Sequence, residues 1–195
     1  MKQKKNTVVV VICILISVFG FANANVMADS GHVLTVTRYQ QEKSNWCWAA
    51  CAKMAGKYYS GTPVSQTSIV VYIKGANVNG PADLSESTNA ATYASSGYKT
   101  FTGSLIVPSF STVQSRINAN RLMIATCGHY VGLTRDYGHE FVIYGWNVSG
   151  GVNYLLVLDP ANSVSYMAKM PSYSEFVYSS SNWEFKWEAV ITANS

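Results

Sequence analysis

The stretch SNWCWAAC, residues 44–51, places a cysteine between two tryptophans at the predicted start of a helix. Ser44 and Asn45 both favour the N-cap of a helix. Apolar side chains follow at positions 47, 51, 54, 55 and 58, which is helical spacing. We therefore predict a helix that begins after Ser44 or Asn45 and ends before SGTP, residues 60–63. Cys47 then lies in the first turn of this helix.

Cys47 is a candidate nucleophile because of this position. Free backbone N–H groups and the positive end of the helix dipole face a side chain in the first turn. Such surroundings lower the pKa of a thiol and favour the reactive thiolate. Trp46 and Trp48 would form the walls of a cleft and shelter the sulfur. In the alternative interpretation, Cys47 is a small buried hydrophobic residue beneath two aromatic rings.

A thiol nucleophile needs a base, and the chain has three histidines. His139 directly precedes EFVIYGW, residues 140–146, which we predict to be a strand that holds the imidazole rigidly. His32 lies near the predicted mature N-terminus, and His129 lies in GHYVGLTRDYG, residues 128–138, which we predict to be a loop. His139 is therefore the candidate base.

An acidic residue is predicted beside this histidine. The strand at 140–146 returns through NVSGG as a second strand at 152–158. If the turn is centred between Ser149 and Gly150, residues whose numbers sum to 299 face each other, which brings Asp159 beside His139. Asp159 would orient the imidazole through its second nitrogen. The alternative is that Asp159 and Pro160 only begin a turn.

Two donors are candidates for stabilising negative charge on a substrate carbonyl. One is the backbone N–H of Cys47, and the other is the side-chain amide of Gln41, six residues earlier. The alternatives are that Gln41 is simply exposed to solvent, or that its neighbour Gln40 is the donor.

The N-terminal segment, residues 1–28, is predicted to be a secretory signal peptide. It has three lysines, an apolar run at 8–20 broken only by Ser17, and small residues that suit cleavage after Ala24 or Ala28. An uncleaved membrane anchor is the alternative. Without the three lysines the net charge falls from +4 to +1, so no nucleic-acid partner is expected. We expect a secreted, extracellular protein of bacterial type, with no membrane association beyond export.

The remaining residues, 29–195, suit a single domain of the α+β class. Helices come first and antiparallel strands later. The predicted helices are 44–59, 65–74, 84–95 and one capped by Ser109 or Ser111; the predicted strands are 122–127, 140–146, 152–158 and the alternating segment 183–191. A short extended segment at 32–40 precedes the first helix.

Three cysteines remain after residue 28: Cys47, Cys51 and Cys127. An odd number leaves at least one thiol free or bonded to another molecule. A disulfide between Cys51 and Cys127 and no disulfide at all are both allowed. A zinc site formed by the three cysteines and His129 is a further hypothesis, but its spacing matches no familiar pattern. We expect neither a metal nor a cofactor.

The segments QEKSNWCWAAC, GHEFVIYGW and YLLVLDP resemble papain-like cysteine proteases. The likeness is greatest to compact bacterial ones, such as type III effector proteases of plant pathogens and the peptidase domains of bacteriocin exporters. It extends loosely from Gln41 to about Trp187. It implies a papain-like α+β fold in which an N-terminal helical part carries the nucleophile helix and packs against a C-terminal antiparallel sheet. It also implies catalytic roles for Cys47, His139, Asp159 and Gln41.

The expected function is therefore a secreted cysteine endopeptidase, a hydrolase that acts on peptide or protein substrates. Whether a protein inhibitor is a partner stays open. Two alternatives remain. One is a thiol amidase or acyltransferase that acts on cell-wall peptides. The other is a non-catalytic exported binding or toxin-like module with a contact surface formed by Tyr166, Tyr173 and Tyr178.

Overall fold

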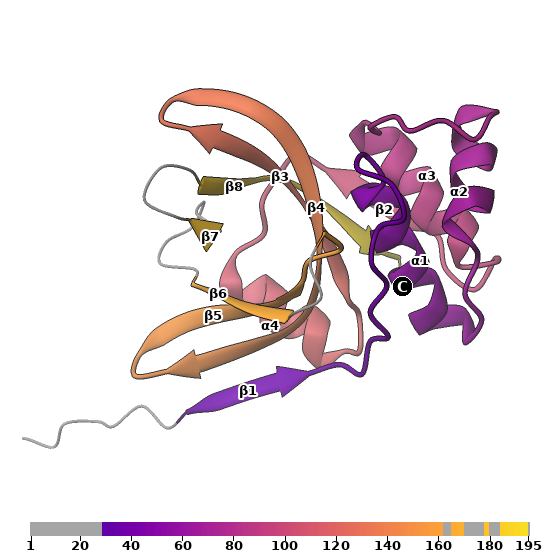
Figure 1. Cartoon of the computed structure of the whole chain (residues 1–195). Helices are drawn as coiled ribbons and strands as arrows, with labels where there is room; N and C mark the ends of the chain where they lie inside the picture. Colours follow the sequence, from indigo (N-terminus) through magenta and orange to yellow (C-terminus); the bar gives the residue numbers. More distant parts are fainter. Residues whose placement is uncertain (1–28, 162–164, 170–177, 180–183, 195) are drawn as a thin grey trace, which may run out of the picture.

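The computed structural model describes residues 29–161, 165–169, 178–179 and 184–194, with the backbone alone at 165–169 and 178–179. The predicted signal peptide, Tyr173, and the side chains of Tyr166 and Tyr178 lie outside the described residues. Helices α1 to α3 gather on one side of the molecule and a strongly curved sheet forms the other (Figure 1). This arrangement confirms the α+β prediction.

The helices largely follow the predicted pattern, and they span Cys47–Ser60 (α1), Gln66–Lys74 (α2), Leu84–Ala94 (α3) and Phe110–Asn118 (α4). Ser65 and Ser109 are the N-caps of α2 and α4, as expected. The start of α1 was predicted wrongly. Trp46 occupies its N-cap without a side-chain cap hydrogen bond, so Cys47 is the first helical residue. Ser44 and Asn45 form a turn instead, and Trp46 N donates to Lys43 O at 3.1 Å.

The strands form one antiparallel sheet with the order β2-β8-β3-β4-β5-β6, in which β1 also pairs with β4 and β7 with β8. The strands are Ser30–Val33 (β1), Phe101–Ser104 (β2), Met123–Val131 (β3), Thr134–Ser149 (β4), Val152–Leu158 (β5), Ser165–Lys169 (β6), Tyr178–Ser179 (β7) and Glu184–Ala193 (β8). Along β8 the burial alternates at its start, as predicted for a half-buried strand.

The prediction of a loop at 128–138 is wrong, because β3 and β4 continue through this segment as a long hairpin. The turn consists of two residues, Gly132 and Leu133, and Gly132 has a φ of +62° that suits glycine. His129 is therefore held on β3, where it pairs with Tyr137 and is 8% exposed. Scattered glycines and charges masked this strand in the sequence, because most of its far half is exposed and lacks apolar alternation.

The register of the β4–β5 hairpin also differs from the prediction. Gly150 and Gly151 form the turn with φ values of +57° and +77°, so Ser149 pairs with Val152 and facing residues sum to 301. An irregularity at Tyr144 then shifts the pairing by one residue, and Ile143 faces Val157. The shift arises within β4, so the position of the turn alone does not predict it.

The core lies between the helices and the sheet. One face of α1 packs against β4 and another against α3, while α3 also contacts β2 and β8. Alanines dominate the buried face of α1, which lets the neighbouring elements approach closely. Within the described residues, none of the helices combines the length and apolar character needed to cross a membrane.

Candidate active site

Cys47 is positioned by a clamp between the turn before α1 and the loop at 76–80. The Asn79 side chain accepts a hydrogen bond from Asn45 N at 3.0 Å and donates one to Ser44 Oγ at 2.9 Å. The indole N–H groups of Trp46 and Trp48 donate to Val78 O at 2.8 Å and Gly80 O at 3.1 Å. Both tryptophans are at most 1% exposed. The tryptophans therefore fix the start of α1 from inside the protein.

A second set of contacts joins this segment to the end of β5. Gln41 N donates to Pro160 O at 2.9 Å, and the Arg38 guanidinium donates to Asp159 O at 3.4 Å. Buried Gln66 on α2 holds the chain from the other side, because its amide donates to Gln40 O at 2.7 Å and accepts from Glu42 N at 3.0 Å. These bonds bring the two predicted site segments, far apart in sequence, side by side.

His139 and Asp159 form a buried pair. His139 Nε2 lies 2.8 Å from Asp159 Oδ1, and the two side chains are 9% and 4% exposed. The same Asp159 oxygen accepts from Ala161 N at 2.8 Å, which fixes the carboxylate. Phe141 packs edge-on against the imidazole with ring centroids 4.7 Å apart. The predicted contact of Asp159 with His139 is thus present, although the predicted register is not.

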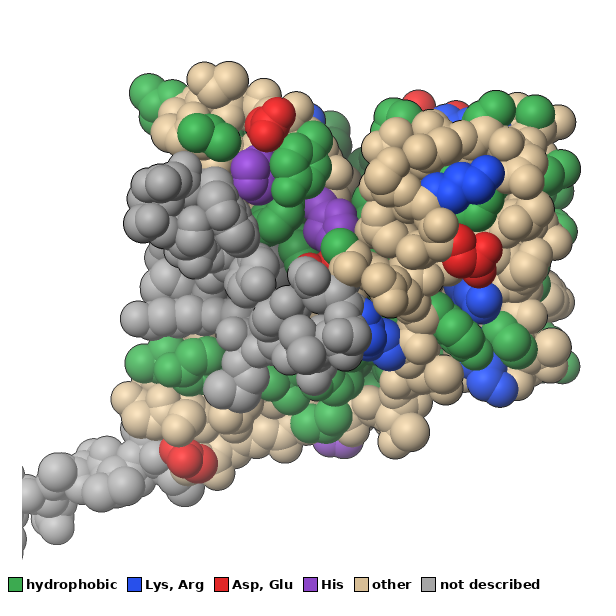
Figure 2. Space-filling view, viewed as in Figure 1, with side chains coloured by type: hydrophobic (Ala, Val, Ile, Leu, Met, Phe, Trp, Pro, Cys, Tyr) green, Lys and Arg blue, Asp and Glu red, His purple; other side chains and the backbone are tan. Residues whose placement is uncertain are grey.

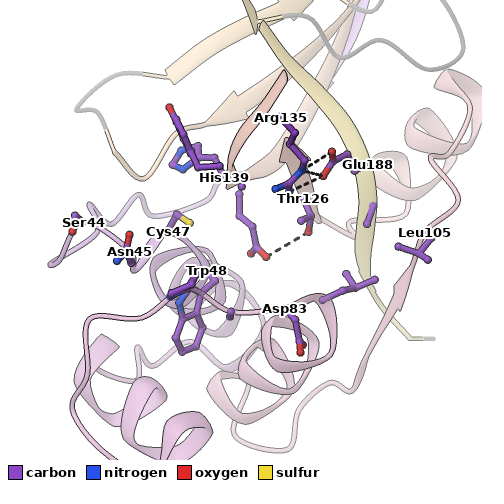
Figure 3. A pocket seen from close by; sticks show the side chains of 17 residues that line it. Ser44, Asn45, Cys47, Trp48, Asp83, Leu105, Thr126, Arg135, His139 and Glu188 are labelled. Carbon is purple, nitrogen blue, oxygen red and sulfur yellow. Dashed lines mark hydrogen bonds and ion pairs between the residues drawn. The ribbon is translucent and has the colours of Figure 1, made fainter. Parts of the chain in front are cut away.

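A cavity of about 610 Å³ lies between the two halves of the molecule, and Cys47 and His139 both line it. Figure 2 shows the surface hollowed there, with histidine side chains in purple on the sheet side. In Figure 3, Cys47 and His139 lie on one side of the pocket, and Arg135, Glu188 and Leu105 lie on the other. The backbone N–H of Glu140, the residue after His139, is near enough to the Cys47 sulfur to act on the pKa of the thiol. The structure therefore brings thiol, imidazole and carboxylate together.

The protonation of Cys47 differs from the expectation of a lowered pKa. Burial, together with the negative charge of Glu140, raises the pKa of the Cys47 thiol from 9.0 to about 12. Hydrogen bonds from the backbone N–H groups of Glu140, Trp48 and Cys47 itself act in the opposite direction. The predicted effect of the helix N-terminus is present, but desolvation outweighs it. At neutral pH the resting site holds a thiol.

Gln41 points away from the role expected of it in the resting structure. Its amide nitrogen donates to Lys43 O at 3.0 Å and Ser44 O at 2.8 Å, which uses both of its N–H groups. Gln41 does not line the cavity. The side chain thus stabilises the turn before α1, and a role as oxyanion donor stays a prediction. Gln40, the competitor, directs its amide to Ala161 O at 3.5 Å.

All three cysteines after residue 28 are free thiols. Cys51 and Cys127 are fully buried, and burial raises the pKa of both thiols well above 9.0. The allowed disulfide between them is therefore absent. Within the described residues, no group of three or more histidine, cysteine, aspartate or glutamate side chains is arranged to hold a metal ion.

Sequence reasoning missed two parts of this site. The loop at 76–80 was recognised only as a loop, although its two asparagines were a signal for side-chain capping of a neighbouring turn. The carboxyl of Glu140 was overlooked because position 140 was counted only as part of a strand. It lies next to His139, opposite Thr126 on β3, and lines the same cavity as Cys47.

Comparisons with known proteins show which family model and which solved structure this chain is similar to. The model of the Peptidase_C39 like family matches residues 33–188. The crystal structure of UfSP from C. elegans is similar with a TM-score of 0.43 and 12% identity, over 84% of this chain. The match covers 34% of the UfSP chain, so this chain spans about a third of its length. A search of curated proteins finds no match.

Proposed function

The chain belongs to the Peptidase_C39 like family, and on that premise we propose that it is an exported cysteine endopeptidase with Cys47, His139 and Asp159 as its catalytic triad. Family membership confirms the predicted resemblance to papain-like cysteine proteases, while the bacterial effector or exporter subtype stays a prediction. The substrate is a peptide or protein, as the activity of a peptidase requires.

The observation that carries this proposal is the buried His139–Asp159 pair beside the cavity that Cys47 lines. Because Nε2 is engaged with Asp159, Nδ1 is the nitrogen left to take the thiol proton. Sγ attacks the peptide carbonyl as this proton moves to His139. His139 then gives the proton to the leaving amine, and water hydrolyses the thioester with His139 as base. Asp159 orients the imidazole and stabilises its charged form.

The negative charge on the carbonyl oxygen requires donors at the mouth of α1. The backbone N–H of Cys47 is one, since the first N–H groups of a helix have no partner within it. For Gln41 to be the second donor, its amide would have to release its hydrogen bond to the carbonyl of Lys43 or of Ser44 and donate to the substrate oxygen instead. The buried Oε1 of Gln41 has no hydrogen-bond partner among the described residues, so its amide position is not fixed by bonds at both atoms.

Export is part of the proposal and rests on the sequence of residues 1–28. The domain boundary at residue 29 belongs to the same proposal and stays a prediction. Expression of the full chain in a bacterium should release a protein whose mass corresponds to cleavage after Ala24 or Ala28. Retention of the full-length chain in the membrane would instead support the uncleaved anchor.

The activity is tested with this purified protein on casein and on a library of fluorogenic peptides. Cys47→Ala and His139→Ala should each reduce kcat/KM by at least about a thousandfold, because nucleophile and base act as one unit. Asp159→Asn should reduce it less, since the amide still contacts the imidazole. Thr102→Val, at the exposed position of β2 and outside the lining of the cavity, is the control. Equal cleavage by all variants would remove the proposal.

A further inference from the structure

Glu140 is a buried acid that the proposed triad does not use. The residue is 4% exposed, and its Oε1 lies 3.4 Å from Thr126 Oγ1, the bond marked from Thr126 in Figure 3. Its Oε2 is buried and makes no hydrogen bond of normal geometry among the described residues, although the Ser87 hydroxyl lies near enough to lower the pKa of this carboxyl. A side chain kept for structure alone would have both oxygens satisfied, since each unmade bond in the interior costs stability. Glu140 lines the cavity, so its carboxyl is placed to meet a donor that enters there.

The other charges in the cavity already have partners. The Arg135 guanidinium contacts both oxygens of Glu188, with nitrogen–oxygen distances from 3.0 to 3.3 Å. The Asp83 carboxylate caps α3 by accepting from Glu86 N at 2.8 Å. Glu140 is therefore the one acid lining the cavity that has neither a cap to form nor a basic partner among the described residues.

No basic side chain among the described residues forms an ion pair with Glu140. Burial raises the pKa of Glu140 to about 7, and the hydroxyls of Ser87 and Thr126 lower it only partly. The titratable and charged groups that face this region come from every element around it: Cys47 and Cys51 on α1, Asp83 before α3, Cys127 on β3, Arg135 and His139 on β4, Asp159 after β5 and Glu188 on β8. A bound cation would supply the missing partner.

We propose that Glu140 determines substrate specificity by binding the cationic side chain of a lysine or arginine, carried by a peptide close to its scissile bond. This inference rests on the proposed peptidase function. Glu140 directly follows His139 on β4 and lines the same cavity as Cys47, so a side chain bound at Glu140 belongs to a residue next to the bond under attack. Trp48, Leu84 and Leu105 line the same cavity and give the aliphatic stem an apolar surface.

The test compares matched peptides that differ at one position, which carries lysine, norleucine or glutamate. Each position near the scissile bond is varied in turn, and kcat/KM is measured for the protein and for Glu140→Gln, which keeps shape and hydrogen bonding but removes the charge. At one position the protein should prefer lysine over norleucine by about 10- to 100-fold, the value of a charge-assisted hydrogen bond. Glu140→Gln should reduce this ratio to near one.

Two matched variants separate Glu140 from other acids. Asp83→Asn keeps the N-cap of α3 and removes the other carboxylate charge without a basic partner in the cavity. Glu184→Gln removes a charge on β8 that lies outside the cavity. Both should keep the lysine preference. The preference should also increase from about pH 6 to about pH 8 as Glu140 ionises, and this increase should vanish in Glu140→Gln.

The outcomes distinguish this inference from the proposed function. If peptides are cleaved and the lysine-to-norleucine ratio is the same in Glu140→Gln, specificity by Glu140 is wrong while the peptidase stands. If only Asp83→Asn loses the preference for lysine over norleucine, the preference is due to Asp83, and the inference is equally overturned. If no peptide is cleaved, the peptidase proposal fails. Binding of the same lysine and norleucine peptides to the Cys47→Ala protein, followed by NMR titration, then decides the role of Glu140.

Discussion

At the residue scale, the chemistry of Cys47 is decided by two opposing effects of very different size. A helix N-terminus typically contributes about 0.3–1 kcal/mol toward a negative charge. The rise of the thiol pKa from 9.0 to about 12 corresponds to about 4 kcal/mol in favour of the neutral form. The effect of burial and of the neighbouring Glu140 on the thiol pKa is therefore larger than that of the helix dipole. Attack by Cys47 then depends on proton transfer to His139.

This difference predicts the reactivity of Cys47 toward iodoacetamide. Because the thiolate is the reactive form, alkylation should be slow at neutral pH and should increase with pH without a plateau up to at least about pH 9. Glu140→Gln should react faster at equal pH above about 7, since the charge that opposes the thiolate is gone. Mass spectrometry identifies the alkylated cysteine, and Cys47→Ala is the control. A rate that is independent of pH from mildly acidic solution upward would indicate a thiolate–imidazolium pair instead.

At the element scale, the position of α1 depends on close contact with α3. Gly56 on α1 faces Ala94 on α3, and a Cβ at position 56 would meet Ala94 O at 2.3 Å, well inside contact distance. The obstacle is a backbone atom, which cannot rotate away. The small residue thus sets the separation of the two helices, and through α1 it sets the place of Cys47 relative to β4.

Gly56→Ala should therefore destabilise the protein, although alanine has the higher helix propensity. The expected loss in the free energy of unfolding is about 1–3 kcal/mol, the usual cost of forcing extra volume into a packed interface. Urea unfolding followed by circular dichroism measures it. Gly80→Ala is the matched control, because the nearest atom to its Cβ would be Val78 Cγ2 at 3.9 Å. A Gly56→Ala protein as stable as its parent would contradict the tight α1–α3 contact.

At the scale of the whole molecule, Glu140, the buried acid that lines the cavity, makes the free energy of unfolding depend on pH. The folded protein holds the proton of Glu140 up to about pH 7, whereas the unfolded chain releases it near 4.5. Between these two pH values the folded state binds more protons than the unfolded state. The contribution of Glu140 to the free energy of unfolding is therefore complete below about pH 4.5 and is lost as the pH rises toward 7. The loss amounts to about 3 kcal/mol.

Glu140→Gln should accordingly be more stable than the parent above about pH 7 by up to about 3 kcal/mol, with a smaller difference near pH 4.5. Urea unfolding of both proteins across this range provides the comparison, and the difference between them isolates Glu140 from other titrating groups. A difference that does not change with pH would show that Glu140 is ionised in the folded protein throughout. A gain in stability together with a loss of lysine preference would identify Glu140 as a residue kept for function.

Much of this protein follows from local sequence. The caps at Ser65 and Ser109, the apolar spacing of α1 and the alternation in β8 each depend on residues close together in the chain, so the helices and the α+β order were predicted correctly. The candidate residues Cys47, His139 and Asp159 were likewise chosen from their places at the ends of elements, and their catalytic roles stay predictions. The long β3–β4 hairpin and the true start of α1 were missed, because pairing and distant loops define them rather than local pattern.

Tertiary structure alone decided how the site is charged and held. The His139–Asp159 contact exists despite a register that the turn did not predict, because the irregularity at Tyr144 and the bonds from Arg38 and Gln41 position the end of β5. Burial of the Cys47 thiol and of the Glu140 carboxyl depends on which elements enclose the cavity. Desolvation is a property of the surrounding volume, and a linear sequence names the groups in that volume without stating how little water remains around them.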